Sequence, residues 1–273
     1  MTQKQRAESF RALHEREGAF VIPNPWDAGS ARLLAALGFE ALATTSSGFA
    51  NSRGRLDGQV ARDEVIEHCR QLSTATDLPV SADLENCFAD DPAEAATTIT
   101  LAAHAGVVGG SIEDYTGDPS NPIYDFALAV ERVHAAVEAS RSLDFPFTLT
   151  ARAENLLRAG HDLDDTIRRL QAFEEAGADV LYAPGLKTLE EVRAVTGALG
   201  KPLNVLGPLV KGVTLAQLAE AGAKRISTGG ALARAAVTAL LRAGREMLDE
   251  GSFGWTSDLE SSANVASLLN ART

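Results

Sequence analysis

Short apolar segments rich in β-branched residues alternate with longer amphipathic segments along almost the whole chain, and this alternation constrains the fold most strongly. The short segments predict β-strands, which we expect at 19–22, 40–44, 79–83, 109–113, 147–151, 180–182, 203–205 and 225–227. The longer segments have the period of helices, which we expect at 28–37, 61–75, 92–105, 124–140, 162–176, 188–198, 214–221 and 229–249.

The connections between these segments favour a closed barrel of the α/β class. Helices pass to strands through similar phrases, namely LGFEAL, AGVVGGSI, AGADVL and AGAKRI, and a glycine shortly before a buried strand is typical of such connections. Successive βα units without a break predict a parallel (β/α)8 TIM barrel. The main alternative is a doubly wound open sheet, which normally has a Gly-rich sequence after its first strand. Here that strand leads into IPNPWD.

The barrel is expected to form one domain spanning residues 1–273, because no linker, repeat or low-complexity tract divides the chain. One barrel of this type typically needs about 250 residues. Residues 251–273 look like an additional C-terminal helix, with Trp255 leading into it and Asp258 as its N-cap. Such an extension either packs across the barrel end or docks on a partner subunit.

The composition limits which classes of partner, and which cellular compartment, we expect for this protein. The net charge of −12 argues against binding to nucleic acid or to an anionic membrane, since both require basic patches. The two cysteines, Cys69 and Cys87, have no disulfide-framework spacing, which fits a reducing compartment. The polar first 18 residues lack the apolar core of a signal peptide, and no apolar run is long enough to span a membrane. We therefore expect a cytoplasmic protein.

Acidic residues at the ends of two neighbouring strands predict a metal site. Asp83 and Glu85 are two residues apart at the end of the third strand, and Glu113 ends the fourth. Side chains two apart on a strand point the same way, and catalytic groups of such barrels sit at the C-terminal strand ends. Converging carboxylates repel one another unless a cation neutralises them, and all-oxygen ligands favour Mg2+, or Mn2+, over zinc. The alternative is that they cap helices or pair with Arg152 or Arg225.

Two further features suggest that an anion binds nearby. Ser46, Ser47 and Gly48 follow the second strand, where hydroxyl and backbone N–H groups can form an anion pocket. Arg152 follows the fifth strand and can clamp a carboxylate with two hydrogen bonds. The alternatives are an ordinary Ser-Gly turn and a salt bridge from Arg152 to Glu113 or Glu85.

Neither the histidines nor the cysteines are convincing catalytic groups. We expect four histidines to lie within helices as surface or packing residues, and a fifth to start a helix: His14, His68, His104, His134 and, last, His161. Cys69 is expected within a helix, and Cys87 lies beside carboxylates that would raise the pKa of its thiol.

Several stretches, in this order along nearly the whole chain, resemble the isocitrate lyase/phosphoenolpyruvate mutase superfamily. They are NPWDAGSARLLAALGFEALATTSSG from residue 24, LDGQVARDEV from 56, PVSADLEN from 79, GGSIED from 109, TARAEN from 150, KPLNVL from 201 and GAKRISTGG from 222. One such match would be weak, but the ordered set is specific.

The resemblance implies a fold, an assembly and a set of site residues. The last helix would be swapped between subunits of a homo-oligomer, a dimer of dimers. Mg2+ would bind near Asp83, Glu85 and Glu113. A 2-oxo acid or enolate carboxylate would be held by Ser46, Ser47, Gly48 and Arg152. Asp57 matches an acidic position that closes over the site, and the mouth would be lined by Asn204 and Ser227. We also expect Trp26, after the first strand, to contact the substrate.

The chain departs from its relatives in the loop after the fourth strand. Isocitrate and methylisocitrate lyases carry a Lys-Lys-Cys-Gly type loop there, whereas this chain reads DYTGDPSNPIYD, without Lys or Cys. Phosphonate-cleaving relatives use a Lys and an Asn in that loop, of which only Asn121 is present. A glutamate that the lyases place after strand 6 is replaced near Pro184, and the metal motif is D-x-E rather than D-x-D.

The remaining residues are suited to stabilising a pyruvate-type enolate. A 2-oxo acid (or 2-hydroxy acid) dicarboxylate would undergo C–C cleavage or decarboxylation, with a bound metal as Lewis acid and with Arg152, Asp57 and Ser46 as the catalytic residues. Two other functions stay open. One is P–C bond chemistry on a phosphonopyruvate-like substrate, and the other is non-catalytic binding of a 2-oxo acid on the same scaffold.

Overall fold

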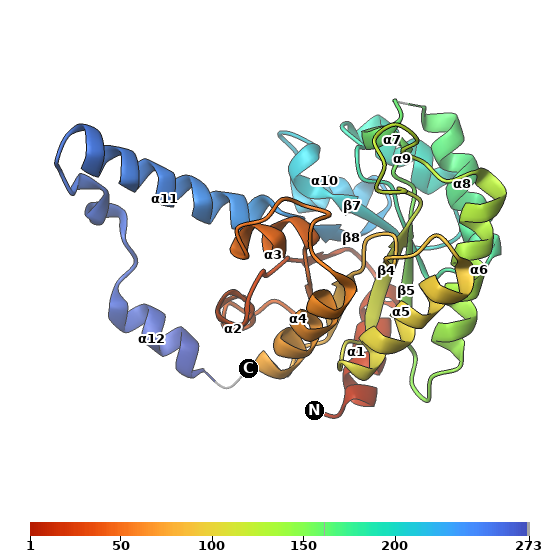
Figure 1. Ribbon diagram of the computed structural model, residues 1–273, viewed down its shortest axis with the longest axis horizontal. Coiled ribbons are helices and arrows are strands. Elements are labelled where there is room, and N and C mark those ends of the chain that lie inside the picture. The colour runs from red at the N-terminus through yellow and green to blue at the C-terminus, as the bar shows by residue number, and fades with distance from the viewer. Residues whose placement is uncertain (161, 272–273) are drawn as a thin grey trace.

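A computed structural model describes residues 1–160 and 162–271 of the chain. Eight parallel strands form one sheet in the order β1-β8-β7-β6-β5-β4-β3-β2, with helices around it (Figure 1). The strands are β1 Phe20–Ile22, β2 Leu42–Ala43, β3 Val80–Asp83, β4 Gly109–Glu113, β5 Thr148–Arg152, β6 Val180–Tyr182, β7 Leu203–Leu206 and β8 Ala223–Ser227. The predicted (β/α)8 barrel is confirmed, and each strand overlaps its predicted segment.

The first and last strands of this order meet through hydrogen bonds at the end of β1. The amide of Ala43 donates to the carbonyl of Pro23 (3.1 Å), and Asn24 Nδ2 donates to the carbonyl of Thr44 (2.8 Å). The Asn24 side chain also accepts hydrogen bonds from the amides of Thr228 and Gly229 (2.8 and 2.9 Å). One asparagine therefore links the ends of β1, β2 and β8, and the sheet is a nearly closed barrel.

The helices that alternate with the strands begin close to where the sequence predicts them. They are α2 Ala28–Ala36, α4 Arg62–Ala75, α5 Pro92–His104, α6 Phe126–Arg141, α8 Leu163–Glu175, α9 Leu189–Gly197, α10 Leu215–Glu220 and α11 Ala231–Asp249. Short polar N-cap residues accept hydrogen bonds from first-turn amides and so fix many of these starts, as at Asp27, Asp91, Asp125, Asp162, Thr188 and Thr214.

Further helical segments lie outside that alternation. Helix α1 (Gln3–Glu15) begins with a capping box formed by Thr2 and Gln5. The short helices α3 (Ser46–Ser52) and α7 (Asn155–Arg158) follow β2 and β5, and a 3-10 turn (η1, Gly207–Leu209) follows β7. The Ser-Gly segment at residue 46 is therefore a helix start capped by Thr45 rather than an ordinary turn.

Helix α1 closes the N-terminal end of the barrel. Its Phe10 packs beside Gly109 at the start of β4, where an added Cβ would lie 2.9 Å from the ring. Phe10 and Leu13 form a buried cluster with Phe20 and Ile22 of β1, and His14 meets the rings of Phe10 and Phe20 edge-on. Apolar packing thus fills the end of the barrel opposite to the C-terminal ends of the strands.

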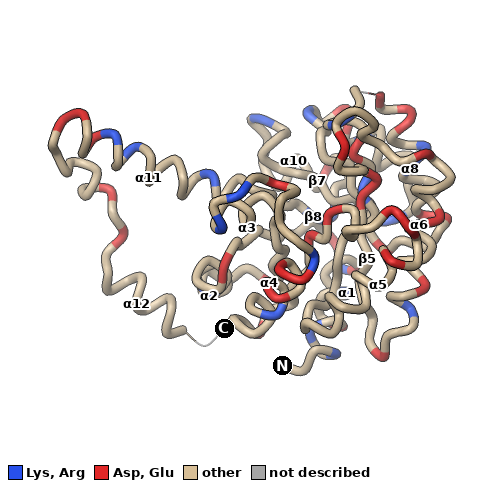
Figure 2. The backbone as a smooth tube through the Cα atoms, in the orientation of Figure 1, with Lys and Arg blue, Asp and Glu red and all other residues tan. Residues whose placement is uncertain are grey.

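The C-terminal arm extends away from the barrel (Figure 1). Helix α11 is followed by a 3-10 turn (η2, Gly254–Asp258) and by α12 (Ser262–Asn270), which returns to α2. The N-cap of α12 is Ser261, which accepts from the amide of Asn264. The prediction that Asp258 caps this helix is wrong, because Asp258 pairs with Arg242 instead (3.1 Å). Basic residues lie along α11 and acidic residues at the turn after it (Figure 2).

Helix α11 leaves a row of large apolar side chains uncovered. Leu240 is 71% exposed and Leu248 is 87% exposed, and the arm also exposes Val237, Leu241, Met247 and Phe253. No helix among the described residues combines the length and the apolar character needed to cross a membrane.

Candidate active site

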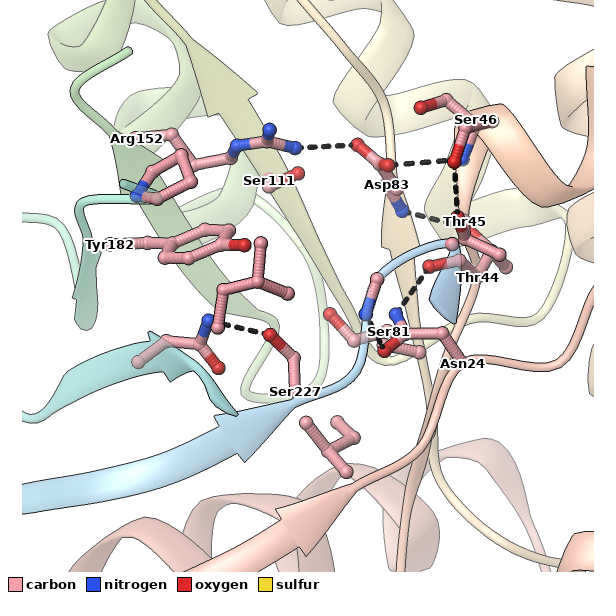
Figure 3. Close-up of a pocket in the computed structure, with 18 of the residues that line it drawn as sticks. Asn24, Thr44, Thr45, Ser46, Ser81, Asp83, Ser111, Arg152, Tyr182 and Ser227 are labelled. Carbon is pink, nitrogen blue, oxygen red and sulfur yellow. Dashed lines mark hydrogen bonds and ion pairs between the residues drawn. The ribbon is translucent and has the colours of Figure 1, made fainter. Parts of the chain in front are cut away.

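A cavity of about 260 Å³ opens at the C-terminal ends of the strands, where catalytic groups of such barrels lie. It continues into the barrel, because several inward-facing positions carry small polar side chains instead of the branched apolar residues that usually fill this space. These positions include Ser81, Ser111, Asn204 and Ser227. Figure 3 shows Ser111 between Arg152 and Asp83, and Ser81 and Ser227 lower in the view.

Arg152, at the end of β5, is the centre of an ion-pair cluster. Its guanidinium contacts Asp83 (2.8 Å), Glu113 (3.0 Å) and Glu154 (2.7 Å), and Figure 3 shows it reaching across to Asp83. Burial alone would lower the pKa of Arg152, but Glu113, Glu154 and Asp83 together hold it well above its ordinary value. Arg152 is therefore a fixed cation whose charge is already shared among three carboxylates.

A second cavity of about 270 Å³ adjoins the first and contains the other predicted metal ligands. Glu85 and Glu113 line it, and both cavities share Ser46, Asp57 and Arg152. Burial, together with Asp83 and Asp57, raises the pKa of Glu85 to about 8. Burial also raises the pKa of Glu113 well above its ordinary value, despite its contact with Arg152.

The two cavities contain more carboxylates than guanidinium groups, and this excess of negative charge favours binding of a cation. Among the described residues, the two cavities are lined by five carboxylates and three guanidinium groups, a formal net charge of −2: Asp57, Asp83, Glu85, Glu113 and Glu154 against Arg152, Arg158 and Arg225. Carboxylate oxygens are the donors that Mg2+ and Mn2+ prefer. The donor set therefore fits a divalent cation.

The described carboxylates are not yet arranged around a shared point. Within 1–160 and 162–271, no three Asp, Glu, His or Cys side chains form a group ready to hold a metal ion. Arg152 lies between Asp83 and Glu113 and contacts both. A cation that used both carboxylates would have to take them over from Arg152.

Unusual backbone follows β3 at the predicted ligands. Glu85, Cys87 and Phe88 have positive φ values of 50°, 58° and 60°, a region that residues other than glycine rarely adopt. The expectation that Glu85 faces the same way as Asp83 along a strand is wrong, because the strand ends at Asp83. The turn nevertheless brings the Glu85 carboxylate to the second cavity. Such strain is concentrated at functional sites in proteins.

Ser46 and Ser47 line the first cavity at the start of α3. The Ser46 amide donates to Asp83 Oδ2 (3.0 Å), and the Ser46 side chain is hydrogen-bonded to Asp57. The Ser47 hydroxyl lies against Gly230, where an added Cβ would be 2.4 Å from its oxygen. A side chain at position 230 would therefore displace the Ser47 hydroxyl.

Gly48 and Trp26 lie beside the site rather than in it. An added Cβ at Gly48 would meet the Cβ atoms of Trp26 and Ala233 at 3.2 and 3.1 Å, and neither Gly48 nor Trp26 lines either cavity. Gly48 thus allows α3 to pack against α11.

The opposite wall of the cavity is a hydrogen-bonded network. Asn204 Nδ2 donates to Ser227 Oγ (3.0 Å), while Asn204 Oδ1 accepts from Arg225 Nε (2.8 Å). Tyr182 is hydrogen-bonded to Ser227, and its ring lies 5.0 Å from the Arg152 guanidinium carbon. The structure therefore brings Asn204 and Ser227 to the cavity, as the sequence predicts.

The loop after β4 forms a hairpin over the second cavity. Tyr115 pairs with Ile123 in an antiparallel bridge, and the Tyr115 ring stacks under the guanidinium of Arg158 (4.2 Å). Asn121 is exposed, and its carbonyl accepts from Thr116 Oγ1 (2.7 Å). Asn121 lines neither cavity.

Asp114 faces away from Glu113 and has a structural role. Its carboxylate accepts from the Glu154 amide (2.7 Å) and pairs with Arg169 of α8 (3.2 Å). Burial raises the pKa of Asp114 to about 6. Because successive side chains of a strand point to opposite faces, Glu113 points into the site and Asp114 points outward to α8.

The cysteines and histidines are placed as the sequence predicts. Burial raises the thiol pKa of both Cys69 and Cys87 to about 12, so neither is a thiolate near neutral pH. His14 and His68 are buried in α1 and α4, whereas two others are exposed on α5 and α6: His104 and His134. The prediction for His161 lies outside the described residues.

Comparison with known proteins identifies the family. The family described as phosphoenolpyruvate phosphomutase matches residues 10–248. A 2-methylisocitrate lyase of Halalkalibacterium halodurans is 30% identical over 86% of this chain and 74% of its own length. The chain belongs to the phosphoenolpyruvate phosphomutase family. It is therefore a member of the isocitrate lyase/phosphoenolpyruvate mutase superfamily that the sequence resembles.

Other relatives in this superfamily differ in their named activities. An oxaloacetate decarboxylase of Bradyrhizobium diazoefficiens is 28% identical over 76% of this chain and 72% of its own length. A lyase/mutase-type protein of Burkholderia cenocepacia J2315 has a solved structure that is 56% identical, with a TM-score of 0.96 and coverage of 98% of this chain and 97% of its own. The structure of 2,3-dimethylmalate lyase is 27% identical (TM-score 0.85), with 99% and 95% covered.

Several side chains that line the first cavity are not singled out by the sequence patterns. Three of them precede a predicted site residue by two positions on the same strand: Ser81, Ser111 and Arg225. A fourth, Tyr182, ends β6. Since alternate residues of a strand face the same side, extending the period of two inward from Asp83, Glu113 and Ser227 would have found the first three. Arg158 follows no such pattern, because only the fold of α7 brings it to the site.

Proposed function

We propose that the protein is a divalent-metal-dependent enzyme that breaks a bond next to the carbonyl of a 2-oxo acid, as a C–C lyase or a decarboxylase. One observation supports this most: surplus carboxylates surround the fixed cation Arg152 at the C-terminal end of the barrel. A site of this kind can hold both a metal and an anionic substrate. The substrate would be a 2-oxo acid or a related dicarboxylate.

The proposed mechanism assigns a role to each group. Asp83, Glu85 and Glu113 would hold Mg2+ or Mn2+, which supplies Lewis-acid stabilisation for negative charge developing on the ketone oxygen. Arg152 would keep Glu154 as its partner and present its remaining donors to the substrate carboxylate.

The other residues orient the substrate and move the proton. Ser46 and Ser47 line the cavity beside Asp83 and would position the carboxylate. Asp57 is hydrogen-bonded to Ser46 where the two cavities meet, and it would exchange a proton with the carbon at which the bond breaks. The exclusion of water by the β4 hairpin would then protect the enolate.

The named activities of the relatives agree with C–C chemistry. 2-Methylisocitrate lyase, 2,3-dimethylmalate lyase and oxaloacetate decarboxylase are named for reactions of organic acids. The family description leaves P–C chemistry as the second candidate, but Asn121, the matching residue of the β4 loop, is exposed and away from the cavities. The third candidate is binding without turnover.

Turnover measured with a panel of 2-oxo acids tests the proposal. The purified protein is mixed with Mg2+ or Mn2+ and with oxaloacetate, substituted malates or phosphonopyruvate, and the products are followed by NMR. Release of pyruvate or another 2-oxo acid without phosphate is the expected result. Phosphate release would favour the second candidate, and tight binding without product would favour the third.

Metal titration of variants tests the ligand assignment. We expect Asp83→Asn and Glu113→Gln to weaken Mn2+ binding by at least about tenfold, because each removes a charged donor. Asp63→Asn is the matched control, since the Asp63 side chain is 95% exposed on α4. Unchanged Mn2+ affinity in both site variants would show that the metal assignment is wrong.

We also propose that the C-terminal arm packs on a second copy of the chain. The exposed leucines of α11 have no cover within the described part of one chain, and α11 projects away from the barrel (Figure 1). Exchange of the arm between subunits of a dimer of dimers would bury this apolar row.

A further inference from the structure

Arg225 is a buried cation without an acidic partner among the described residues. Its side chain comes from β8 and is 5% exposed. Nε donates to Asn204 Oδ1 (2.8 Å), and Nη2 donates to Thr150 Oγ1 (3.0 Å). Nη1 is buried and makes no hydrogen bond in the described structure. Both partners are neutral, so the positive charge of Arg225 is not compensated by an ion pair.

The guanidinium lies at the inner end of the first cavity. Thr150, its hydrogen-bond partner, precedes Arg152 by two residues on β5, so Arg225 occupies the next inward-facing layer beneath Arg152. Arg225 lines this cavity together with Ser81 and Ser111. Figure 3 shows Ser111 between Arg152 and Asp83, with Ser81 lower in the same view. The floor of the cavity thus combines an uncompensated guanidinium with hydroxyl donors.

The other ionisable groups near Arg225 do not neutralise its positive charge. Burial, opposed by Tyr182 and assisted by the charge of Arg152, lowers the pKa of Arg225 to about 10. His14 of α1 has a pKa lowered to about 3 by burial and by Arg225, so it is neutral. Burying an unpaired charge costs several kcal/mol. A buried polar atom without a hydrogen bond, such as Nη1 of Arg225 among the described residues, commonly marks a functional group or a ligand site.

A second buried arginine shows the arrangement expected of a structural role. Arg169 also has its side chain largely buried, but its guanidinium pairs with Asp114 (3.2 Å) and Asp165 (2.9 Å). Arg132, also buried, donates to the backbone carbonyls of Asn86, Ala89 and Asp90. Among the described residues, Arg225 has neither a carboxylate partner nor a hydrogen bond at Nη1, and it faces the cavity.

We propose that Arg225 forms a carboxylate subsite at the floor of the cavity, which binds the second carboxylate of a dicarboxylate substrate. This inference rests on the proposed function, because the first carboxylate is assigned to Ser46, Ser47 and Arg152. The Arg225 guanidinium gains an anionic partner when the substrate binds, and Ser81 and Ser111 donate further hydrogen bonds. The substrate is accordingly a 2-oxo or 2-hydroxy dicarboxylate rather than a monocarboxylate.

Matched ligand pairs test the subsite. Oxaloacetate and 2-oxobutyrate differ by a carboxylate in place of a methyl group, and 2-oxoglutarate and 2-oxovalerate form the same pair one carbon longer. With Mn2+ present, we expect the wild type to bind the dicarboxylate of at least one pair about tenfold or more tightly. Arg225→Met should bind both members of that pair with similar affinity and keep the wild-type affinity for the monocarboxylate.

The stability of Arg225→Met separates a binding role from a structural one. We expect its Tm without ligand to equal or exceed that of the wild type, because the substitution removes a buried unpaired charge. Arg225→Lys keeps one positive charge and serves as the second variant if Arg225→Met does not fold. We expect an intermediate preference for the dicarboxylate in the Lys variant. A folded Arg225 variant with an undiminished preference overturns the inference.

Arg158 provides the control for the location of the subsite. Among the described residues its guanidinium pairs with one carboxylate, that of Glu154 (3.6 Å), and Arg158 lines both cavities. Arg158→Met should keep the dicarboxylate preference. Loss of the preference in Arg158→Met and its retention in Arg225→Met would overturn the proposal. Wild-type binding of both ligand classes without preference contradicts this inference alone, whereas binding of neither contradicts the proposed function as well.

Discussion

Single residues in this barrel are distinguished by whether their charge has a partner. Asp114 and Arg169 neutralise each other behind β4, while Arg152 neutralises three carboxylates in the site. Arg225 has only neutral partners among the described residues. Removing one member of a buried pair leaves the other charge unpaired, which costs far more than removing an exposed charge.

Arg169→Met should therefore be strongly destabilising. It leaves the Asp114 carboxylate buried, so we expect the free energy of unfolding to fall by about 3–5 kcal/mol. Arg168→Met is the control at the neighbouring position, because the Arg168 side chain is 65% exposed, and it should change stability by less than about 0.5 kcal/mol. Urea unfolding of both variants gives the values. Equal effects would contradict the structural role of the Asp114–Arg169 pair.

A glycine at the cavity wall gives a second prediction at this scale. An alanine Cβ at position 230 would overlap the Ser47 hydroxyl, so Gly230→Ala should displace Ser47 and weaken 2-oxo acid binding by about tenfold or more. Gly244→Ala is the control, because nothing lies within 4 Å of its Cβ position in α11. Calorimetric titration measures the affinity. Wild-type affinity in Gly230→Ala would exclude a role for Ser47 in binding.

Among the elements, α3 and α4 are held together by a histidine that must stay neutral. The His68 ring of α4 stacks on Phe49 of α3 (centroids 3.9 Å apart, planes 11° apart). Burial lowers the pKa of His68 to about 4, against a weaker opposing effect of Asp27. Because α3 carries Ser46 and Ser47, protonation of His68 would loosen the helix that forms one wall of the site.

Acid should consequently destabilise the wild type through His68. The unfolded chain binds a proton at His68 below about pH 6.5, whereas the folded chain binds it only below about pH 4. The free energy of unfolding is therefore unaffected by His68 above about pH 6.5 and decreases as the pH falls from about 6.5 toward 4. At pH 5 the loss is about 2 kcal/mol relative to pH 7. His68→Phe should lack this component. Urea unfolding at both pH values tests it, and identical pH dependence in the two proteins would contradict it.

In the molecule as a whole, the apolar side chains of the barrel are buried, whereas many of those on the C-terminal arm are exposed to solvent. The barrel has a continuous buried core, whereas α11 exposes large apolar side chains far from it. A contiguous exposed apolar surface commonly marks an interface.

Disrupting the apolar row of α11 should therefore change the assembly and leave the barrel folded. We expect Leu240→Glu together with Leu248→Glu to lower the molar mass in solution from that of a tetramer, measured by light scattering after size exclusion. Leu157→Glu, at an exposed leucine of the barrel, is the control and should not. A wild type that is monomeric would contradict the proposed exchange of the arm.

Local sequence patterns predict the fold and several of the side chains that line the candidate site. Hydrophobic periodicity and helix caps are local properties, so they predict the strand and helix positions along the chain. The carboxylates at the ends of β3 and β4 and Arg152 at the end of β5 could be placed together because the C-terminal ends of parallel strands converge. The family resemblance rested on motifs at these same strand ends.

The pairing of the charges, and the set of side chains that reach the cavity, depend on the tertiary structure and do not follow from local sequence patterns. The turn after β3 gives Glu85 a positive φ, which strand periodicity does not predict. Gly48 of α3 packs against Trp26 and against Ala233 of α11 because of the way those two helices meet. The isolation of Arg225 depends on which groups surround it in three dimensions, since burial and the distance between charges are properties of the folded chain.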